Sequence, residues 1–487
     1  MPNDEKKTHE RWPSSEAFYR DRDHRTQLEV NELHRYVYQP VEIHLDGNLA
    51  GDVSVQRIAL VAANLTARWA RKIRVVLPEI ALASPLKLFG DAALGARVLR
   101  EMREADPFGD FEVSESGVDQ PEALRLFIGP CTTSQKQESD YTVMASGWVA
   151  YGVRGSAVAH RGIEPAAASA AALAGALGAG DLFKRAIGQP RTEWLGKIRW
   201  CTWSHHLGTC ASCCQAPPIP NQADVGNLLV AGVGAIGSAL LYILGLMPVT
   251  GCITLLDRDR VETSNLNRSP LFTAMDVVGM RRKIDVGKAL LTAMGVECPT
   301  VMGTWRDQSG QFVREPFDVW VSLTNEDGAW SEVPFQLPPI VLHGTTTSGW
   351  GVGFGRHIPR VEDCTVCRLP RPHVEFRGPC SEGEVFLDAK EPVRASLPFL
   401  STIAAALIAT ELLKLPFSNA SSLPNAVQAD LRIGLPAVVT ALLGPTASCR
   451  GCQMAQLPLW LERGGRSRFA SMFSLGRPAD PEGRVYP

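Results

Sequence analysis

A glycine-rich turn and the charged side chains that follow it are the first residues whose types and spacing could do chemistry. Gly232, Gly234 and Gly237 have the spacing Gly-x-Gly-x-x-Gly, between a predicted strand and a predicted helix. Such a turn brings backbone N–H groups close to a phosphate, and the helix N-terminus adds positive partial charge. Asp257 and Asp259 follow at the spacing of an acid that holds ribose hydroxyls. The pattern predicts a nucleotide site, and alone it fits a nicotinamide dehydrogenase equally well.

Four cysteines form a second group. Cys364-x-x-Cys367 and Cys449-x-x-Cys452 are two pairs with the spacing of metal-binding knuckles. Four thiolates suit tetrahedral Zn²⁺, and the long separation between the pairs suits a site that holds two distant segments together. The sequence therefore predicts a structural zinc site.

The residues from 257 to 268 carry a resemblance to a known family. They read DRDRVETSNLNR, which is similar to the DxDxVExSNLNR signature of the superfamily of ubiquitin-activating, ThiF and MoeB adenylating enzymes. The resemblance favours an ATP-dependent adenylating enzyme over a dehydrogenase. It implies that Asp259 contacts the ribose and that Asn265 and Arg268 contact the phosphates of ATP.

The family also has a lysine on the phosphates, in a Gly-x-x-Lys sequence. Here the spacing from Gly279 to Lys283 is one residue longer; Lys283 is favoured, and Arg282 is the alternative. Attack of a carboxylate on the α-phosphate builds negative charge on the leaving pyrophosphate, which fixed cations and Mg²⁺ must balance. We therefore expect Arg268 and Lys283 to take part in catalysis.

The expected magnesium ligand departs from the family pattern. Similar enzymes have Thr-Asp-Asn at the end of a later strand, with the aspartate on Mg²⁺, whereas this chain has Thr324-Asn325-Glu326-Asp327. An amide is a poorer ligand for Mg²⁺ than a carboxylate. Either Glu326 or Asp327 replaces the aspartate beside Asn325, or the metal is held differently.

The resemblance also implies a thioester-forming cysteine. In similar enzymes it lies in a crossover loop between the first zinc pair and the next helix, a segment that corresponds to residues 362–396. Cys380 lies there, among glycine and proline residues that are typical of a loop. The thiolate is the reactive form, and Arg377 could help to stabilise it. We expect Cys380 to be the nucleophile, and the zinc cysteines to be structural.

Two further groups remain open. One lies just before the glycine-rich turn and could bind a second metal or could be a capping loop with free thiols: His205, His206, Cys210, Cys213 and Cys214. The other lies near the N-terminus and could supply an arginine that reaches the phosphates from the other half of the molecule: Arg20, Arg22 and Arg25. For any single one of these arginines, a solvated surface position is the simpler interpretation.

Two blocks of alternating strands and helices are expected to position these residues. The first has predicted strands at residues 57–63, 73–77, 123–128 and 141–145, and an Ala-rich helix at about 164–185. The second has predicted strands at 227–231, 253–256, 318–323 and 339–343, and a helix that begins near Pro398. Similar helix ends at 181–184 and 411–414 suggest a diverged repeat. The fold class predicted is α/β, with two doubly wound Rossmann-like halves, an inactive adenylation domain and then an active one.

Length and composition agree with a multidomain globular enzyme. The 487 residues are 45% hydrophobic and 21% charged, with a formal net charge of −2, so bulk charge gives no reason to expect a nucleic-acid or membrane partner. We expect an N-terminal arm (1–50), an inactive domain (51–195), a linker (196–224), an active domain (225–455) and a C-terminal tail (456–487). No signal peptide or membrane span is recognised, which predicts a cytoplasmic protein.

The sequence therefore predicts an enzyme that adenylates the C-terminal glycine of a ubiquitin-like protein with ATP and Mg²⁺. It would form a thioester on Cys380 and pass the protein to a conjugating enzyme. The size and arrangement are closest to the activating enzymes of bacterial antiphage operons. Two alternatives remain open: a sulfur-carrier adenylyltransferase of the ThiF and MoeB type, and a degenerate binding module without catalysis, which Asn325 suggests.

Overall fold

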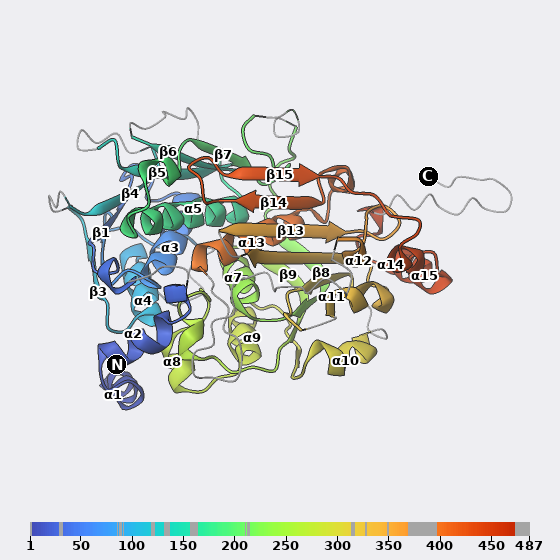
Figure 1. Cartoon of the computed structure of the whole chain (residues 1–487), viewed down its shortest axis with the longest axis horizontal. Helices are drawn as coiled ribbons and strands as arrows, with labels where there is room; N and C mark the ends of the chain where they lie inside the picture. Colours follow the sequence, from blue (N-terminus) through green and yellow to red (C-terminus); the bar gives the residue numbers. More distant parts are fainter. Residues whose placement is uncertain are drawn as a thin grey trace.

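The computed structural model describes residues 2–28, 33–84, 86, 90, 92–117, 122–130, 137–155, 164–209, 211, 215–312, 317–326, 329–347, 350–368 and 397–472. Within them the chain forms a seven-stranded sheet and an eight-stranded sheet, each mostly parallel and flanked by helices (Figure 1). The predicted α/β class with two Rossmann-like halves is confirmed. Among the described helices, none has the length and apolar character that crossing a membrane requires.

The first half contains the seven-stranded sheet, with strand order β3-β2-β1-β4-β5-β6-β7. Strands β1 to β5 are parallel, and β6 and β7 are antiparallel to their neighbours. Its elements and those before it are α1 (Pro2–Arg11), α2 (Ser15–Asp23), the 3-10 helices η1 (Thr26–Leu28) and η2 (Leu33–Arg35), β1 (Val41–Leu45), α3 (Val53–Ala67), β2 (Lys72–Val76), α4 (Leu94–Ala105), β3 (Asp110–Ser114), β4 (Leu124–Ile128), β5 (Tyr141–Ser146), β6 (Val149–Arg154), α5 (Ala168–Ala186), η4 (Arg191–Glu193) and β7 (Ile198–Cys201).

The second half contains the eight-stranded sheet, with order β10-β9-β8-β11-β12-β13-β14-β15. The strands from β10 to β12 are parallel and the remainder antiparallel. Its elements are β8 (Ala223–Ala231), α7 (Ala235–Leu244), β9 (Val249–Leu256), η5 (Thr263–Asn265), α8 (Ala274–Val278), α9 (Lys283–Ala293), β10 (Thr300–Val301), α10 (Trp305–Phe312), β11 (Val319–Ser322), α11 (Ala329–Glu332), η6 (Val333–Gln336), β12 (Ile340–Thr347), β13 (Gly351–His357), α12 (Thr365–Arg368), α13 (Pro398–Lys414), η7 (Ser418–Ser422), β14 (Ala426–Asp430), β15 (Ala437–Ala441), α14 (Arg450–Met454), α15 (Pro458–Arg466) and η8 (Ala470–Met472).

The two halves repeat one topology. Strands β1 to β7 have the same spatial order as β8 to β14, and α5 and α13 occupy the same place in that order, before β7 and β14. The contacts at the ends of these helices are also reciprocal. Lys184 of α5 donates to the backbone oxygen of Arg432 in the second half (2.8 Å), and Lys414 of α13 lies 3.1 Å from His205 Nε2 in the first. This arrangement supports the predicted internal repeat.

Buried helices join the two halves. α5 packs against α3 and α13, and α13 packs against α7, with α5 and α13 near the middle of the molecule in Figure 1. Small residues allow this close approach: a Cβ on Gly175 would lie 2.8 Å from Val61 of α3, and a Cβ on Gly180 would lie 3.2 Å from Phe399 of α13. The Ala-rich stretch is therefore the core of the interface between the halves.

One predicted strand is wrong. Residues 57–63 lie in the helix α3, which Asp52 begins by accepting hydrogen bonds from the backbone N–H groups of Ser54 (2.7 Å) and Val55 (3.2 Å). The helix is buried on nearly all sides, so its sequence lacks the polar face that marks an amphipathic helix. A short apolar run of this kind does not distinguish a buried strand from a buried helix.

The first sheet also extends beyond the residues expected for the first domain. Strand β1 lies within the predicted N-terminal arm, and it is central in the sheet, between β2 and β4. Strand β7 lies within the predicted linker and pairs with β6. The first half thus begins before residue 51 and continues past residue 195.

Candidate functional site

The glycine-rich turn joins β8 to α7 at the carboxyl end of the second sheet. Gly232 has a φ of +98°, and a Cβ there would lie 2.8 Å from the carbonyl atoms of Leu323. A Cβ on Gly237 would lie 2.1 Å from Gly232 O, whereas one on Gly234 would meet nothing within 4 Å. Two glycines are therefore required by close packing, and the third leaves open space at the N-terminus of α7, where a phosphate could approach.

Asp257 holds the turn in place from the end of β9. Its Oδ2 accepts a hydrogen bond from the N–H of Val233 (2.7 Å), and its Oδ1 accepts one from the N–H of Asp259 (2.8 Å). Burial raises the pKa of Asp257, and the positive charge of Lys283 opposes that increase. With both oxygens engaged by backbone N–H groups, Asp257 is placed to shape the turn.

Asp259 and Lys283 form an ion pair beside the turn. Lys283 Nζ lies 2.7 Å from Asp259 Oδ2, and the N–H of Lys283 donates to the backbone oxygen of Asp259 (3.0 Å). The Asp259 side chain is 55% exposed, so it remains accessible to a ligand, while that of Lys283 is 10% exposed. The side chain of Arg282, the alternative cation, contacts Met302. The geometry thus favours Lys283 over Arg282 as the cation at the site.

Asn265 and Arg268 lie in a compact loop after β9. Asn265 Oδ1 accepts a hydrogen bond from the N–H of Glu262 (3.0 Å), which begins the 3-10 helix η5. Arg268 is buried, and its guanidinium donates to the backbone oxygen of Ser264 and to Asn267 Oδ1 (3.2 Å for the latter). Both predicted phosphate contacts are therefore held by their own loop.

The N-terminal region reaches this loop. Thr26 Oγ1 accepts a hydrogen bond from Asn267 Nδ2 (2.8 Å). Burial lowers the pKa of His24, and the positive charges of Arg25 and Arg268 lower it further.

The three arginines of this region lie in different surroundings. Arg22 is buried in ion pairs with Asp23 (2.7 Å) and Asp106 (2.8 Å), which gives it a structural place. Arg20 is 77% exposed and lies 3.3 Å from Asp21. Arg22 is thus committed to ion pairs, and Arg25 is the arginine whose charge acts on His24 together with that of Arg268.

The candidate magnesium ligands follow β11. Asn325 is exposed at the end of this strand, beside the close contact of Leu323 with Gly232. Glu326 is engaged elsewhere: its carboxylate accepts hydrogen bonds from the N–H groups of Trp305 (2.9 Å) and Arg306 (3.2 Å), at the N-terminus of α10. Asp327 lies outside the described residues. Glu326 is thus already used in capping a helix, so Asp327 beside Asn325, or a different arrangement of the metal, stays open.

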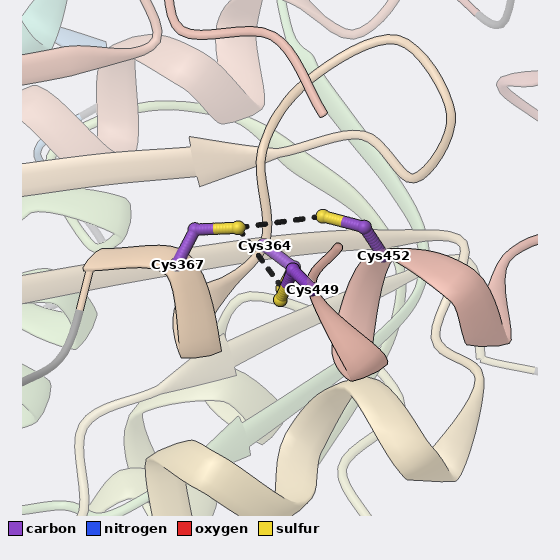
Figure 2. A group of neighbouring side chains, drawn as sticks. All are labelled: Cys364, Cys367, Cys449 and Cys452. Atoms are coloured by element: carbon purple, nitrogen blue, oxygen red, sulfur yellow. Dashed lines mark hydrogen bonds between the residues drawn. The ribbon is translucent and has the colours of Figure 1, made fainter. Parts of the chain in front are cut away.

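The four predicted metal cysteines come together (Figure 2). Their Sγ atoms all lie within 4.8 Å of one another, with separations of 3.8 Å for Cys364–Cys367, 3.6 Å for Cys364–Cys449 and 3.4 Å for Cys367–Cys452. Tetrahedral Zn²⁺ with Zn–S bonds of about 2.3 Å requires S–S separations of about 3.8 Å. A Cβ on Gly451 would lie 2.7 Å from Cys364 Sγ, so a glycine is needed at this position between Cys449 and Cys452. The cluster is compatible with a zinc site.

A chain of contacts joins the cysteine cluster to the loop after β11. Thr365, next to Cys364, donates to the backbone oxygen of Trp330 (2.6 Å), and the Trp330 indole N–H donates to the backbone oxygen of Thr324 (3.0 Å). The Trp330 ring also packs edge-on against His343, 4.5 Å away. The position of the Asn325 loop is therefore coupled to the metal-binding knuckle.

The second possible metal group does not form one among the described residues. His205 is fully buried, where its Nε2 lies 2.7 Å from Glu411 Oε1 and 3.1 Å from Lys414 Nζ. Burial lowers the pKa of His205 to about 4, and the positive charge of Lys414 contributes. Cys210, Cys213 and Cys214 lie outside the described residues, and so does Cys380.

The first half contributes contacts that the sequence did not indicate. Arg68, the C-cap of α3, donates to the backbone oxygen of Leu266, within the loop that carries Arg268 (2.6 Å). Arg68 has no motif around it, and it lies about 200 residues before the loop it contacts. Sequence spacing gives no signal for a contact between two halves, so only the fold reveals it.

Comparison with known protein families finds a match within the second half. Residues 223–432 match the model of the ThiF family. No curated protein sequence matches the chain.

Several solved structures of one enzyme resemble the chain. Escherichia coli MccB with selenomethionine-labelled MccA is 20% identical over 47% of this chain and 66% of that chain, with a TM-score of 0.37. Escherichia coli MccB with ATP is 18% identical over 47% of this chain and 67% of that chain, with a TM-score of 0.35. The microcin C7 biosynthetic enzyme MccB with N-formylated MccA is 18% identical over 47% of this chain and 67% of that chain, with a TM-score of 0.36. The chain covers less than two thirds of the length of the first of these.

Proposed function

Because residues 223–432 form a ThiF family domain, we propose that this protein adenylates the C-terminal glycine of a ubiquitin-like protein with ATP and then captures it as a thioester on Cys380. The observation that carries the proposal is the arrangement at the carboxyl end of the second sheet. There an open glycine turn lies next to Asp259 and Lys283, with the loop of Asn265 and Arg268 following in the same domain.

The first step is nucleophilic substitution at phosphorus. A carboxylate oxygen of the substrate forms a bond to the α-phosphorus of ATP, the bond from that phosphorus to the bridging oxygen breaks, and pyrophosphate leaves. The leaving group gains negative charge, and Lys283 and Arg268 balance it. Asp259 would accept hydrogen bonds from the ribose when Lys283 turns toward the phosphates.

Mg²⁺ would neutralise phosphate charge at the same place. Asn325 and Asp327 would hold it, since Glu326 caps α10. Zn²⁺ on the four cysteines would have a structural role, because all four positions of a tetrahedron are then filled by protein sulfur atoms.

The turn from β1 to α3, which lies within the described residues, is not open to a phosphate, and this supports the assignment of the first half as the inactive domain. At the turn from β1 to α3, the carboxylate of Asp52 occupies the N-terminus of the helix by accepting the N–H groups of Ser54 and Val55. In the second half the corresponding N-terminus of α7 has no side-chain cap. A carboxylate in that position takes the N–H donors that a phosphate would use and repels its charge.

A partly exposed strip on the second sheet suits a protein substrate. Thr345, Gly353, Gln428 and Val439 lie side by side across β12 to β15. The neighbouring residue Gly344 points toward α13, because a Cβ there would lie 3.0 Å from Ile408 of that helix. The strip, which starts at the next residue, therefore lies on the face of the sheet that α13 does not cover. The parallel pairing of β11 with β12 ends at Ser322 and His343, and Ser322 also pairs with Ala231, just before the glycine turn. β12 continues beyond this point, so the strip lies on the same side of the molecule as the glycine turn. An extended C-terminal peptide lying along small residues there would bring its carboxylate to ATP.

Exposed apolar residues adjoin this strip. Val439 on the edge strand β15 is 66% exposed, and Ile433 and Leu435 in the turn before it are 53% and 61% exposed. Apolar side chains gathered at one edge of a sheet are typical of a surface that another protein covers. We assign the folded body of the ubiquitin-like protein to this edge.

The second step is acyl transfer to sulfur. The Cys380 thiolate, having lost its proton to solvent, attacks the carbonyl carbon of the acyl-adenylate. A C–S bond forms, the bond from carbon to the phosphate oxygen breaks, and AMP leaves. A conjugating enzyme would then accept the acyl group on its own cysteine. On the resemblance set out above, the pathway served is bacterial antiviral defence.

Adduct formation with a purified ubiquitin-like protein tests this function. Wild type with Mg·ATP should form an adduct that dithiothreitol cleaves, Cys380→Ala should form none, and Cys380→Ser should form an ester that resists dithiothreitol. Both variants should retain ATP–pyrophosphate exchange, because adenylation precedes acyl transfer. Undiminished reducible adduct in Cys380→Ala would move the nucleophile elsewhere.

The same reaction separates the alternatives. Passage of the thioester to a conjugating enzyme supports the proposal, whereas delivery of the acyl group to sulfide indicates a sulfur-carrier enzyme. No exchange with any ubiquitin-like protein would indicate a binding module.

A further inference from the structure

The helix α3 of the first half carries two buried arginines that reach into the second half. Arg57 lies near its beginning and Arg68 follows its last residue as the C-cap, and both are nearly inaccessible to solvent. Arg57 donates to the backbone oxygen of Leu246, just beyond α7 (2.8 Å). Arg68 donates instead to the loop that carries Asn265 and Arg268. The same helix therefore contacts both sides of the nucleotide-binding unit.

Arg68 contacts the loop at three carbonyl groups. Its Nη1 donates to the backbone oxygen of Leu266 (2.6 Å), and its Nη2 donates to those of Pro270 (2.7 Å) and Phe272 (3.2 Å). These three residues lie on both sides of Arg268. A single planar guanidinium thus ties together the two ends of the segment that presents the predicted phosphate contact.

The loop itself is a pair of linked turns. The N–H groups of Arg268 (3.1 Å) and Ser269 (3.0 Å) donate to the backbone oxygen of Asn265, and the N–H of Phe272 donates to that of Ser269 (3.1 Å). These bonds are all local, and nothing in them fixes the loop relative to the glycine turn. The contacts to Arg68 and the contact of Asn267 with Thr26 come from the first half.

The surroundings of Arg68 fix its orientation. Asn64, one turn earlier on α3, accepts from Arg68 Nε (2.8 Å) and donates to the backbone oxygen of Pro270 (3.2 Å). Asn64 in turn donates to Glu101 (3.1 Å), which accepts from Tyr242 of α7 (2.5 Å). Burial lowers the pKa of Arg68 to about 9, while the charges of Tyr242 and Glu101 oppose that decrease. A buried cation that relies on backbone oxygens is held only while those oxygens stay in place.

From this geometry we infer that Arg68 is a positioning residue for adenylation: by binding the carbonyl groups of Leu266, Pro270 and Phe272, it holds the Arg268 loop at the distance from the glycine turn that ATP requires. The inference rests on the proposed function, since it concerns the same ATP site. It also gives the inactive half a defined part in that site. Arg68 acts through the loop and touches neither ATP nor the protein substrate.

Arg57 provides a matched control. It lies on the same helix, is buried, crosses to the second half, and has its pKa lowered to about 10 by burial. Its contacts are with the backbone oxygens of Leu246 and Ala166 (3.3 Å) and not with the loop. Arg57→Gln should therefore reproduce the loss of interface stability that Arg68→Gln causes, without displacing Arg268.

The experiment uses the full-length protein with Mg·ATP as the probe. Kd for Mg·ATP is measured by titration calorimetry at a temperature where both glutamine variants are folded, and amide hydrogen exchange is followed in peptides that cover residues 263–272. Arg68→Gln should weaken Mg·ATP binding by about 10- to 100-fold, as small displacements of a binding group do, and Arg57→Gln should leave it within about twofold. Arg68→Lys, which supplies fewer donors, should fall between Arg68→Gln and wild type.

Exchange in the 263–272 peptides should rise by about tenfold or more in Arg68→Gln and remain near wild type in Arg57→Gln. Equal Kd values for the two glutamine variants would overturn the inference, and so would unchanged exchange in the loop. If Arg68→Gln does not fold, Asn64→Ala, which removes the orienting contact, replaces it with the same expected pattern. Wild type that fails to bind Mg·ATP while Arg68→Gln still loosens the loop would overturn the proposed function and leave the structural role of Arg68 supported.

Discussion

Asp257 and Asp259 lie two residues apart at the end of β9 and have different roles. Asp257 is used by two backbone N–H groups, while Asp259 is paired with a lysine and is largely exposed. The sequence predicted a nucleotide site that includes both acids, but spacing alone could not distinguish the residue that shapes the turn from the one that is more exposed. Only the hydrogen bonds of the folded chain make that distinction.

Lys283→Met should reduce ATP–pyrophosphate exchange by about 10²- to 10³-fold, the usual effect of removing one group that stabilises developing charge. Its Tm should change little, since the partner Asp259 is 55% exposed and an ion pair with an exposed member contributes little to stability. Arg282→Met is the matched control and should exchange at nearly the wild-type rate. Equal losses in the two variants would contradict the assignment of Lys283.

His205 should make the protein lose stability at mildly acidic pH. Its pKa in the folded protein is about 4, below the value of about 6.5 in an unfolded chain. Between these values the unfolded chain binds a proton that the folded protein does not, so stability falls as pH decreases from 6.5 to 4, by up to about 3 kcal/mol. The groups that face His205 are Glu411, Lys414 and, through Glu411, Arg356.

His205→Asn tests this prediction, because asparagine tolerates the φ of +61° found at this position. Denaturant unfolding of both proteins at several pH values should show a shallower acid dependence in the variant. Other buried histidines are present in both proteins and cancel in the difference. Parallel curves between pH 4 and 6.5 would show that His205 does not titrate as described.

At the scale of elements, the second half follows its sequence closely. Its predicted strands all form, because continuous apolar runs bounded by glycine, proline and acidic residues are typical of buried parallel strands. The strands of the first half are harder to predict from sequence. Residues 57–63 are an apolar run that forms a helix, and β1 includes charged and polar residues within the strand. In the site, Glu326 could not be recognised as the cap of α10, because the two are brought together only by the fold.

The cysteine cluster should contribute to stability and to the ATP site. The purified protein should contain about one zinc per chain, and removing it with a chelator should lower Tm by about 5 °C or more. Because Trp330 joins the knuckle to the backbone of Thr324, zinc removal should also increase hydrogen exchange in peptides around Asn325. Cys449→Ser should behave like the chelated protein, and Cys252→Ser, which lies outside the cluster, should behave like wild type. Full zinc content in Cys449→Ser would exclude this ligand set.

The whole molecule is an asymmetric pair of halves. The same topology occurs twice, yet Asp52 fills the helix N-terminus in the first half and a glycine turn leaves it open in the second. The paired helix ends at residues 181–184 and 411–414 indicated the repeat from sequence. The contacts between halves did not follow from sequence, because buried residues such as Arg68 pair with backbone oxygens, which leave no pattern of residue types.

The exposed edge of the second sheet should determine affinity for the protein substrate. Val439→Glu introduces a charge where an apolar partner surface is expected, and it should raise KM for the ubiquitin-like protein by about tenfold or more while KM for ATP is unchanged. Leu461→Glu on α15, where the leucine is also exposed, is the matched control and should leave both values unchanged. A rise in KM for ATP, or equal effects in the two variants, would place the substrate elsewhere.

The central claim is that the second half joins AMP to a carboxylate, and the fate of the phosphate label tests it most directly. Cys380→Ala, which should stop after the first step, is incubated with a ubiquitin-like protein and ATP labelled at either the α- or the γ-phosphate. The account predicts that label from the α-position, and none from the γ-position, appears on the protein substrate, with release of pyrophosphate. Transfer of the γ-label, or release of pyrophosphate without α-label on the substrate, would contradict it.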